Sequence, residues 1–231
     1  MAKKENIRRL FNNIAPKYDF LNHLLSFNID KIWRCKAIKY IKKQNLERVL
    51  DIACGTGDFS FLAVKHGAKE LIGVDISENM FNIATEKATK KGVSGKVSFR
   101  YGDSEQLEFP DGYFSAVIVA FGVRNFENLS LGLSEMHRVL RSGGQVIILE
   151  FSRPIIFPMK QLYGLYFKNI LPRLGGAISG NKSAYEYLPN SVSSFPQSKE
   201  FLELMSCTGF TDLVQHRLTF GISTIYVGVK S

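Results

Sequence analysis

The chain has 231 residues, of which 45% are hydrophobic and 22% charged, a balance typical of a folded globular protein and not of a disordered one. No apolar run approaches the ~20 residues that a membrane-spanning helix needs, and the first residues lack the apolar stretch of a signal peptide. Thirty Lys and Arg against 21 Asp and Glu give a net charge of +9, which favours an anionic partner such as nucleic acid, an acidic membrane surface or an anionic ligand. The three cysteines lack metal-ligand spacing, so we expect a cytoplasmic protein with reduced thiols and no metal site.

The first two thirds of the chain predict a helical cap followed by alternating strands and helices. Residues 5–44 are expected to be helical with a break near Pro16. Helices are then expected at 58–66, 77–92 and 128–141, between β-rich runs at 48–53, 71–75, 97–103, 114–120 and 145–150. This alternation is typical of a parallel sheet wrapped by helices, so the predicted fold class is α/β.

The pattern changes after Phe151. A segment rich in proline and aromatic residues precedes a helix at 198–208 and strands at about 211–219 and 223–229. Only three residues separate these strands, so they must pair antiparallel. Five parallel strands completed by such a hairpin predict the Rossmann-like, seven-stranded sheet of class I methyltransferases. We expect one domain over residues 1–231, divided into a cap (1–44), a cofactor-binding core (45–151), a substrate-covering insertion (152–198) and a helix with the hairpin (199–231).

A glycine-containing turn follows the first predicted strand. Gly55 and Gly57 allow a sharp turn and close approach of a ligand, and the helix after them offers unpaired N–H groups. Ser60 stands where a dinucleotide fingerprint needs a third glycine or an alanine, which disfavours a pyrophosphate-binding turn. A tight turn without any ligand is the alternative interpretation.

Three aspartates follow or end predicted strands at the same sheet edge. Asp75 is placed to accept hydrogen bonds from both hydroxyls of an adenosine ribose, and Asp103 from an adenine amino group, with the Ser104 N–H near a ring nitrogen. Asp51 would repel a pyrophosphate but attract an ammonium group. We therefore expect S-adenosylmethionine rather than NAD, with Asp51 near the amino group of its methionine end.

Several blocks of sequence closely resemble the UbiE-type methyltransferases of ubiquinone and menaquinone biosynthesis. The blocks most specific to that family are Tyr18-Asp-Phe-Leu-Asn22, Phe121-Gly-Val-Arg-Asn-Phe126 and Leu149-Glu-Phe-Ser-Arg-Pro154. The resemblance implies the class I methyltransferase fold, S-adenosylmethionine as cofactor, and transfer of a methyl group to a ring carbon of a polyprenylated quinol. It also implies cofactor contacts from Ser60, Asp75, Asp103, Ser104 and Ala120, although family members often have a hydroxyl or amide residue where Ala120 stands.

The FGVRN block suggests where the reaction takes place. Arg124 is expected beside the cofactor, where it would stabilise a developing phenolate or orient a water, and its alternative role is a salt bridge to Glu150. Asn125 is expected to support Arg124. Tyr18 is a candidate for contacting the quinol, as are Asp19 and Tyr185. Apolar residues at helical spacing in 158–174 predict either a core helix or an interfacial, substrate-covering helix.

The predicted function is C-methylation of demethylmenaquinol in menaquinone biosynthesis. The first alternative is C-methylation of a methoxylated polyprenyl benzoquinol in ubiquinone biosynthesis. An RNA methyltransferase would use the positive charge, but no RNA-binding tract is present in the sequence. A catalytically silent S-adenosylmethionine-binding protein would have a degraded loop, which is not observed. We also expect transient contact with an anionic membrane at the inner face of the cell membrane, no nucleic acid partner, and a homodimer as an open alternative to a monomer.

Overall fold

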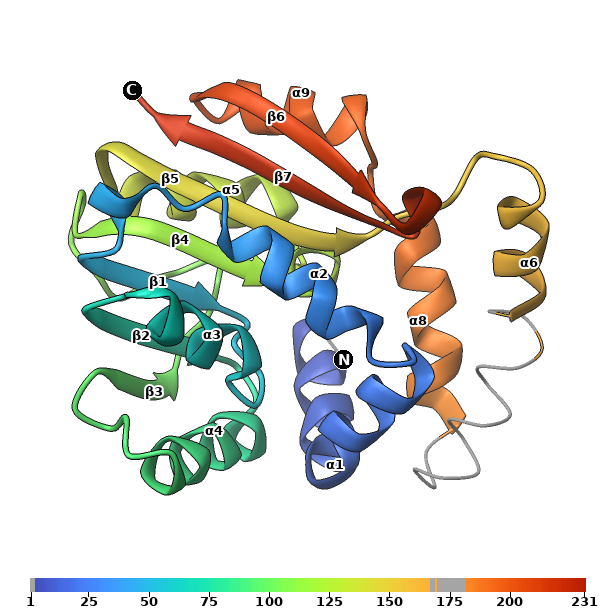
Figure 1. Ribbon diagram of the computed structural model, residues 1–231, viewed down its shortest axis with the longest axis horizontal. Coiled ribbons are helices and arrows are strands. Elements are labelled where there is room, and N and C mark those ends of the chain that lie inside the picture. The colour runs from blue at the N-terminus through green and yellow to red at the C-terminus, as the bar shows by residue number, and fades with distance from the viewer. Residues whose placement is uncertain (1–2, 167–168, 170–181) are drawn as a thin grey trace.

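The computed structural model describes residues 3–166, 169 and 182–231 (Figure 1). Its centre is a seven-stranded sheet with the order β3-β2-β1-β4-β5-β7-β6. The strands are β1 (Arg48–Ile52), β2 (Glu70–Asp75), β3 (Val97–Tyr101), β4 (Phe114–Ala120), β5 (Leu140–Phe151), β6 (Phe210–Leu218) and β7 (Ser223–Lys230). Strand β7 pairs antiparallel with both β5 and β6, and the other pairs are parallel. The predicted fold class is therefore confirmed.

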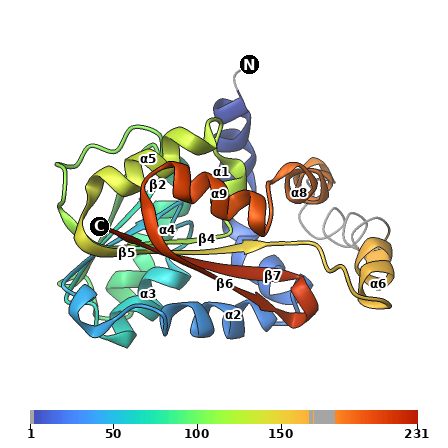
Figure 2. The same ribbon diagram turned by 90° about the horizontal axis from the view of Figure 1, so that it is seen from above.

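Helices cover both faces of the sheet, as Figure 2 shows. One face packs against α5 (Leu129–Val139) and α9 (Lys199–Cys207), with Met136 and Phe201 in the core. The other packs against α2 (Ile29–Ile38) and α3 (Asp58–His66), with Ala37 and Phe59 in the core. Helix α4 (Glu78–Lys90) follows β2. Alternate residues of the central strands enter the two clusters, because side chains of a strand point to opposite faces.

The start of β5 differs from the prediction. We expected a helix over 128–141 and a strand from residue 145, but α5 ends at Val139 and Leu140 already pairs with Phe114 of β4. A register irregularity follows before Gln145 pairs with Ala116. Gly143, at φ +72°, takes a backbone conformation that L-residues rarely adopt, so the glycines form an irregular strand entry instead of a helix stop.

The predicted break at Pro16 is wrong, because α1 (Lys3–Leu25) runs through it. Proline has no N–H to donate to the carbonyl four residues earlier, which normally ends a helix. Here that carbonyl, Asn12 O, accepts a bond from Asn79 Nδ2 at 3.0 Å. The Asn12 side chain also accepts from Ser77 Oγ at 2.7 Å. A tertiary contact thus replaces the missing helical bond and ties α1 to the start of α4.

The insertion after β5 provides α6 (Met159–Leu165) and α8 (Lys182–Ser194). Both lie at the end of the molecule that also holds the β6–β7 connection (Figures 1 and 2). That connection contains the short helix η4 (Thr219–Gly221), and two other short helices are η1 (Lys43–Asn45) and η2 (Val123–Asn125). Among the described residues, no helix is both long enough and apolar enough to cross a bilayer.

Candidate active site

The candidate site lies where the strand order reverses between β1 and β4. In an open parallel sheet, ligands bind at the carboxyl ends of the strands beside this reversal. The two segments that leave the sheet here are the loop after β1, with Gly55, and the segment after β4, with Phe121 and Gly122. Both segments line one pocket with an open volume of about 680 Å³. The same pocket receives Asp75 at the end of β2 and Asp103 after β3.

Left-handed backbone shapes the loop after β1. Gly55 has φ +55° and Gly57 has φ +85°. A Cβ at Gly57 would lie 2.9 Å from ring atoms of Phe61 and Phe99, so this glycine is required for packing. A Cβ at Gly55 would meet nothing within 4 Å, and Gly55 lines the pocket. The absence of a side chain at Gly55 therefore leaves this part of the pocket open.

Asp75 is fixed by backbone donors at the edge of the pocket. Its carboxylate accepts bonds from Gly55 N and Ser77 N, both at 2.8 Å. Burial raises the pKa of this carboxyl to about 6, although the two backbone donors oppose the rise. Asp103 faces the same pocket and pairs with Lys4 of α1 at 2.6 Å. Ser104 also lines the pocket, so three predicted contacts to an adenosine group lie in one place.

Asp51 is the most perturbed acid of the site. Desolvation raises its pKa to about 7, against the lowering effects of a hydrogen bond from Ser60 Oγ and of the Arg34 cation. Among the described residues, its Oδ1 atom has no hydrogen-bond partner. Ser60 is fully buried behind Asp51. The structure thus gives Ser60 the role of holding Asp51, whereas the resemblance implied a direct contact to the cofactor.

A small pocket joins Asp51 to a cation that the sequence did not point to. Arg34 of α2 lines it together with Asp51, Gly55 and Ala120. The Arg34 side chain is 8% exposed and forms a salt bridge with Asp30. A buried carboxylate and a buried guanidinium at one pocket match the ammonium and carboxylate groups of an amino acid. With the adenosine contacts at the adjoining pocket, the residues fit S-adenosylmethionine.

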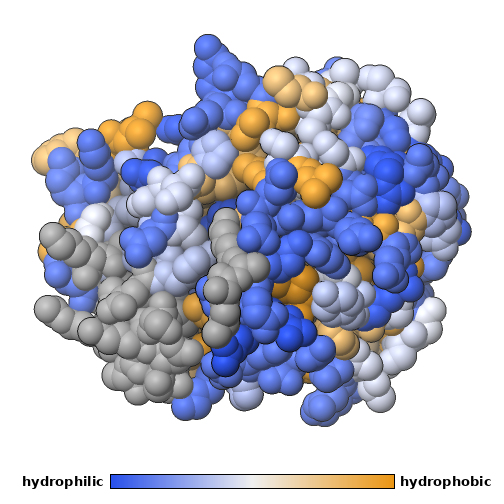
Figure 3. Space-filling view, turned by 180° about the vertical axis from the view of Figure 1, so that it is seen from behind, coloured by the Kyte–Doolittle hydropathy of each residue, from blue (hydrophilic) through white to orange (hydrophobic). Residues whose placement is uncertain are grey.

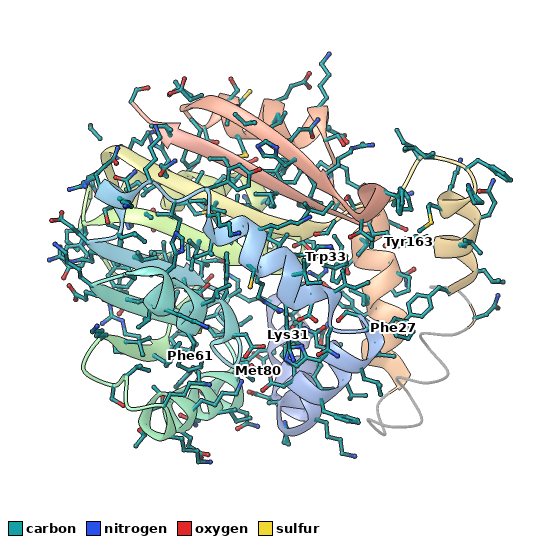
Figure 4. All side chains as sticks on the ribbon, in the orientation of Figure 1. Phe27, Lys31, Trp33, Phe61, Met80 and Tyr163 are labelled. Carbon is teal, nitrogen blue, oxygen red and sulfur yellow. The ribbon has the colours of Figure 1, made fainter. Side chains whose placement is uncertain are left out.

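A second, mostly apolar pocket has an open volume of about 1340 Å³ and adjoins the first. Its walls come from α1, α2, α6, α8 and η4, with Trp33, Tyr163 and Leu188 among them. Figure 4 labels Trp33 on α2 and Tyr163 on α6 around this space. Phe121 lines both large pockets, and Tyr18 lines these two and the small pocket at Asp51. Met159, Leu162, Tyr163 and Tyr166 of the 158–174 stripe line this pocket. Residues 167–168 and 170–174 lie outside the described part.

Arg124 forms the salt bridge that we considered as its alternative role. Its Nη1 lies 2.8 Å from Glu150 Oε1, and its backbone N–H donates to Glu150 Oε2 at 3.3 Å. The side chains of Arg124 and Glu150 are 6% and 0% exposed. Burial raises the pKa of Glu150, and the Arg124 cation opposes that rise. Arg124 also lines the apolar pocket, so it is both a paired cation and a wall residue.

The other predicted contacts have mixed outcomes. Asn125 lines the cofactor pocket and accepts a bond from Tyr187 OH of α8 at 3.0 Å, so its described partner is Tyr187 and not Arg124. Burial raises the pKa of Tyr18. Asp19 accepts from Thr56 Oγ1 and pairs with Lys87 at 2.5 Å, which ties α1 to the glycine loop and to α4. The side chain of Tyr185 lies outside the described residues.

This protein is a class I methyltransferase that uses S-adenosylmethionine. The features that define this class are the order of the strands, the glycine loop after β1 and the acidic residues at the edge of the pocket. Solved structures share this fold. A S-adenosylmethionine-dependent methyltransferase of Thermotoga maritima, described as a possible histamine N-methyltransferase, matches with a TM-score of 0.69 at 20% identity over 97% of this chain and 99% of that one. The [4+2]-cyclase SpnF matches with a TM-score of 0.72 at 15% identity over 98% and 96%.

Sequence comparison then gives the family. The ubiE/COQ5 methyltransferase family matches residues 1–230, and the chain belongs to this family. It is similar to the demethylmenaquinone methyltransferase of Bacteroides fragilis, with 48% identity over 229 residues that cover 99% of this chain and 94% of that protein. It is also similar to the ubiquinone/menaquinone biosynthesis C-methyltransferase UbiE of Geobacter sulfurreducens, with 44% identity over 230 residues, covering 99% and 90%.

Proposed function

We propose that this methyltransferase C-methylates demethylmenaquinol, a prenylated naphthoquinol, in menaquinone biosynthesis. The observation that carries the proposal is the apolar pocket of about 1340 Å³ that shares Tyr18 and Phe121 with the cofactor pocket. A prenylated ring needs an apolar chamber directly beside the methyl donor. The relatives from Bacteroides fragilis and Porphyromonas gingivalis, 48% and 41% identical, are named demethylmenaquinone methyltransferase, which supports this substrate.

Five side chains or backbone groups of this chain would hold the cofactor. Asp75 would accept from the ribose hydroxyls and Asp103 from the adenine amino group, while Ser104 N–H would donate to a ring nitrogen. Asp51 and Arg34 would pair with the ammonium and carboxylate of the methionine end. When bound, S-adenosylmethionine supplies an electrophilic methyl group.

The chain must also make the quinol ring carbon nucleophilic. Loss of the proton from the adjacent hydroxyl pushes electron density onto that carbon, and a nearby cation favours the phenolate form. Arg124 is such a cation on the wall of the apolar pocket. Glu150 holds its guanidinium in place, so little reorganisation is needed when charge develops. Tyr18 and the pair of Asn125 with Tyr187 would orient the quinol hydroxyls.

The benzoquinol alternative has a methoxy group where the naphthoquinol has its fused second ring, and both present a hydroxyl beside a free ring carbon. Purified protein should be assayed with labelled S-adenosylmethionine and either demethylmenaquinol or the methoxylated benzoquinol, at matched tail length. We expect label in the naphthoquinol. Preference for the benzoquinol would change the substrate, and activity on neither would overturn the proposal. Total RNA serves as the third arm, and label in RNA would favour the nucleic acid alternative instead.

We also infer peripheral contact with an anionic membrane at the cytoplasmic face. The net charge of +9 and the prenyl tail of the proposed substrate support this location.

A further inference from the structure

Large apolar side chains surround the mouth of the apolar pocket and point into solvent. Phe27, at the α1–α2 turn, is 75% exposed and Leu162 of α6 is 53% exposed, yet both line the pocket. Phe220 of η4 is 65% exposed and follows Thr219, another lining residue. Three segments far apart in the sequence thus place exposed apolar groups at one opening. Contiguous apolar surface of this kind marks a binding face.

The apolar surface extends beyond the mouth on the same segments. Phe20 (61% exposed) and Leu24 (45%) are four residues apart near the end of α1, which puts them on one side of this helix, just before Phe27. Ile156 (57%) and Phe157 (78%) lie between β5 and α6. Figure 3, seen from behind, shows apolar (orange) side chains at the edge where this β5–α6 segment lies.

Hydrogen bonds hold these segments together, so the surface is a built feature of the fold. Trp33 Nε1 of α2 donates to Thr219 Oγ1 of η4 at 2.7 Å. Tyr166 OH, at the end of α6, donates to the carbonyl of Leu25 at 2.6 Å. Figure 1 shows α6, η4 and the α1–α2 connection at the same end of the molecule.

The charged residues beside this surface are mostly basic. Residues 14–36 contain four Lys or Arg against two Asp. The two acids are already paired, Asp30 with Arg34 and Asp19 with Lys87. Exposed lysines of α2, among them Lys31 and Lys36, remain on the outside of the molecule. Figure 4 labels Phe27 and Lys31 on this part of the chain.

We propose that this end of the molecule, the docking face, binds an anionic lipid bilayer. The exposed aromatic and aliphatic groups around Phe27, Phe157 and Phe220 enter the boundary between headgroups and acyl chains, and the lysines of α2 contact anionic headgroups. The mouth of the apolar pocket then opens into lipid. This inference rests on the proposed function, because a prenyl tail would pass from bilayer to pocket without crossing water.

Two features of the docking face favour a bilayer over a protein partner. The docking face has apolar groups at a pocket mouth, where a protein partner would close the entrance that the substrate needs. Its flank is basic without intervening free acids in residues 14–36, which suits a uniformly anionic surface and not a mixed protein interface.

The test uses exposed residues of the docking face that do not line the pocket. The full chain carrying Phe157→Ser and Phe220→Ser is compared with wild type in sedimentation with vesicles of phosphatidylglycerol and phosphatidylcholine, or of phosphatidylcholine alone. Leu131→Ser, an exposed residue of α5 (44%), is the matched control. We expect the double variant to bind anionic vesicles at least tenfold more weakly than wild type, and the control to bind within twofold. Wild type should prefer the anionic vesicles.

Turnover with two kinds of quinol tests this inference separately from the proposed function. With a short-tailed quinol in solution, the double variant should retain turnover within twofold of wild type. With a long-tailed quinol in vesicles, its turnover should fall about tenfold. Equal vesicle binding by the double variant and wild type overturns the docking face. A change in oligomeric state of the double variant would instead assign the face to a second copy. Inactivity of wild type on the short-tailed quinol would contradict the proposed function, whatever the vesicles show.

Discussion

Replacement of Asp51 by asparagine tests how the cofactor site uses a buried charge. Burial raises the pKa of this carboxyl to about 7, and Oδ1 has no hydrogen-bond partner among the described residues. Without a ligand, the carboxyl is therefore mostly protonated at pH 6 and mostly ionised at pH 8. If the ionised form pairs with the ammonium of the cofactor, binding must release a proton at low pH.

The pH dependence has a definite size. Affinity falls up to ~10-fold, or about 1.4 kcal/mol, for each pH step below the pKa. Wild type should therefore bind S-adenosylhomocysteine roughly tenfold more weakly at pH 6 than at pH 8. A hydrogen bond to a charged group contributes about 1.5 to 3 kcal/mol, so Asp51→Asn should weaken binding at pH 8 by roughly 10- to 100-fold. The variant should also lose most of the pH dependence.

As pH rises, the stability of the ligand-free protein should fall, whereas its affinity for the cofactor should rise. The folded-state pKa of Asp51 is raised above its ordinary value of 3.8, so its contribution to the free energy of unfolding is fully present below that value and is lost as pH rises through 7. The ligand-free wild type is then less stable at pH 8 than at pH 6. Asp51→Asn has no such loss and should be more stable than wild type at pH 8, by on the order of 2 kcal/mol.

Calorimetry between pH 6 and 8 measures the affinities, and thermal unfolding measures the stabilities. Methylthioadenosine, which lacks the amino acid, is the control ligand, and its affinity should respond to neither the substitution nor this pH change beyond a small contribution from Asp75. Unchanged affinity of Asp51→Asn for S-adenosylhomocysteine at pH 8 would refute the assignment of Asp51 to the ammonium group.

Three further substitutions separate the remaining roles. Asp75→Ala should weaken both S-adenosylhomocysteine and methylthioadenosine by about 2 kcal/mol or more in calorimetry, because both ligands contain the ribose; a loss confined to one of them would contradict the ribose assignment. Arg34→Lys should weaken S-adenosylhomocysteine about tenfold and leave methylthioadenosine unchanged, since only the former has a carboxylate; equal losses would make Arg34 structural. Arg124→Gln should lower turnover ~100-fold with cofactor affinity within a few-fold, as for an interaction made in the transition state. Collapse of cofactor binding would assign Arg124 to the fold through Glu150.

The polar residues of the sheet edge were predictable because parallel strands bring their carboxyl ends to one edge. Gly55, Asp75 and Asp103 follow three successive strands, and strand order alone places them around one pocket. No side-chain contact had to be known. The same argument placed Phe121 and Arg124 after β4, on the other side of the topological switch.

The contributions of the helices were not predictable in this way. Arg34 and Tyr187 lie on α2 and α8, whose positions depend on tertiary packing that no local pattern encodes. A signal for Arg34 did exist, because Asp30 stands four residues earlier and an Asp–Arg pair at this spacing stabilises a helix. That spacing is usually a surface feature, and only burial shows that the cation faces a pocket. The prediction of a helix break at Pro16 was wrong for the same reason. The hydrogen bond that proline cannot donate to Asn12 O is replaced by one from Asn79, which is far away in the sequence.

The two roles considered for Arg124 do not exclude each other. An isolated guanidinium in an apolar pocket would be strongly destabilising, so a cation at this wall needs a permanent counterion. Glu150, fully buried at the end of β5, supplies it. A quinol with both hydroxyls protonated is neutral and leaves this pair balanced. If the quinol loses its proton beside this wall, as proposed, Arg124 would face two anions and stabilise both. The salt bridge therefore keeps a cation in an apolar chamber, at the place where negative charge is proposed to develop.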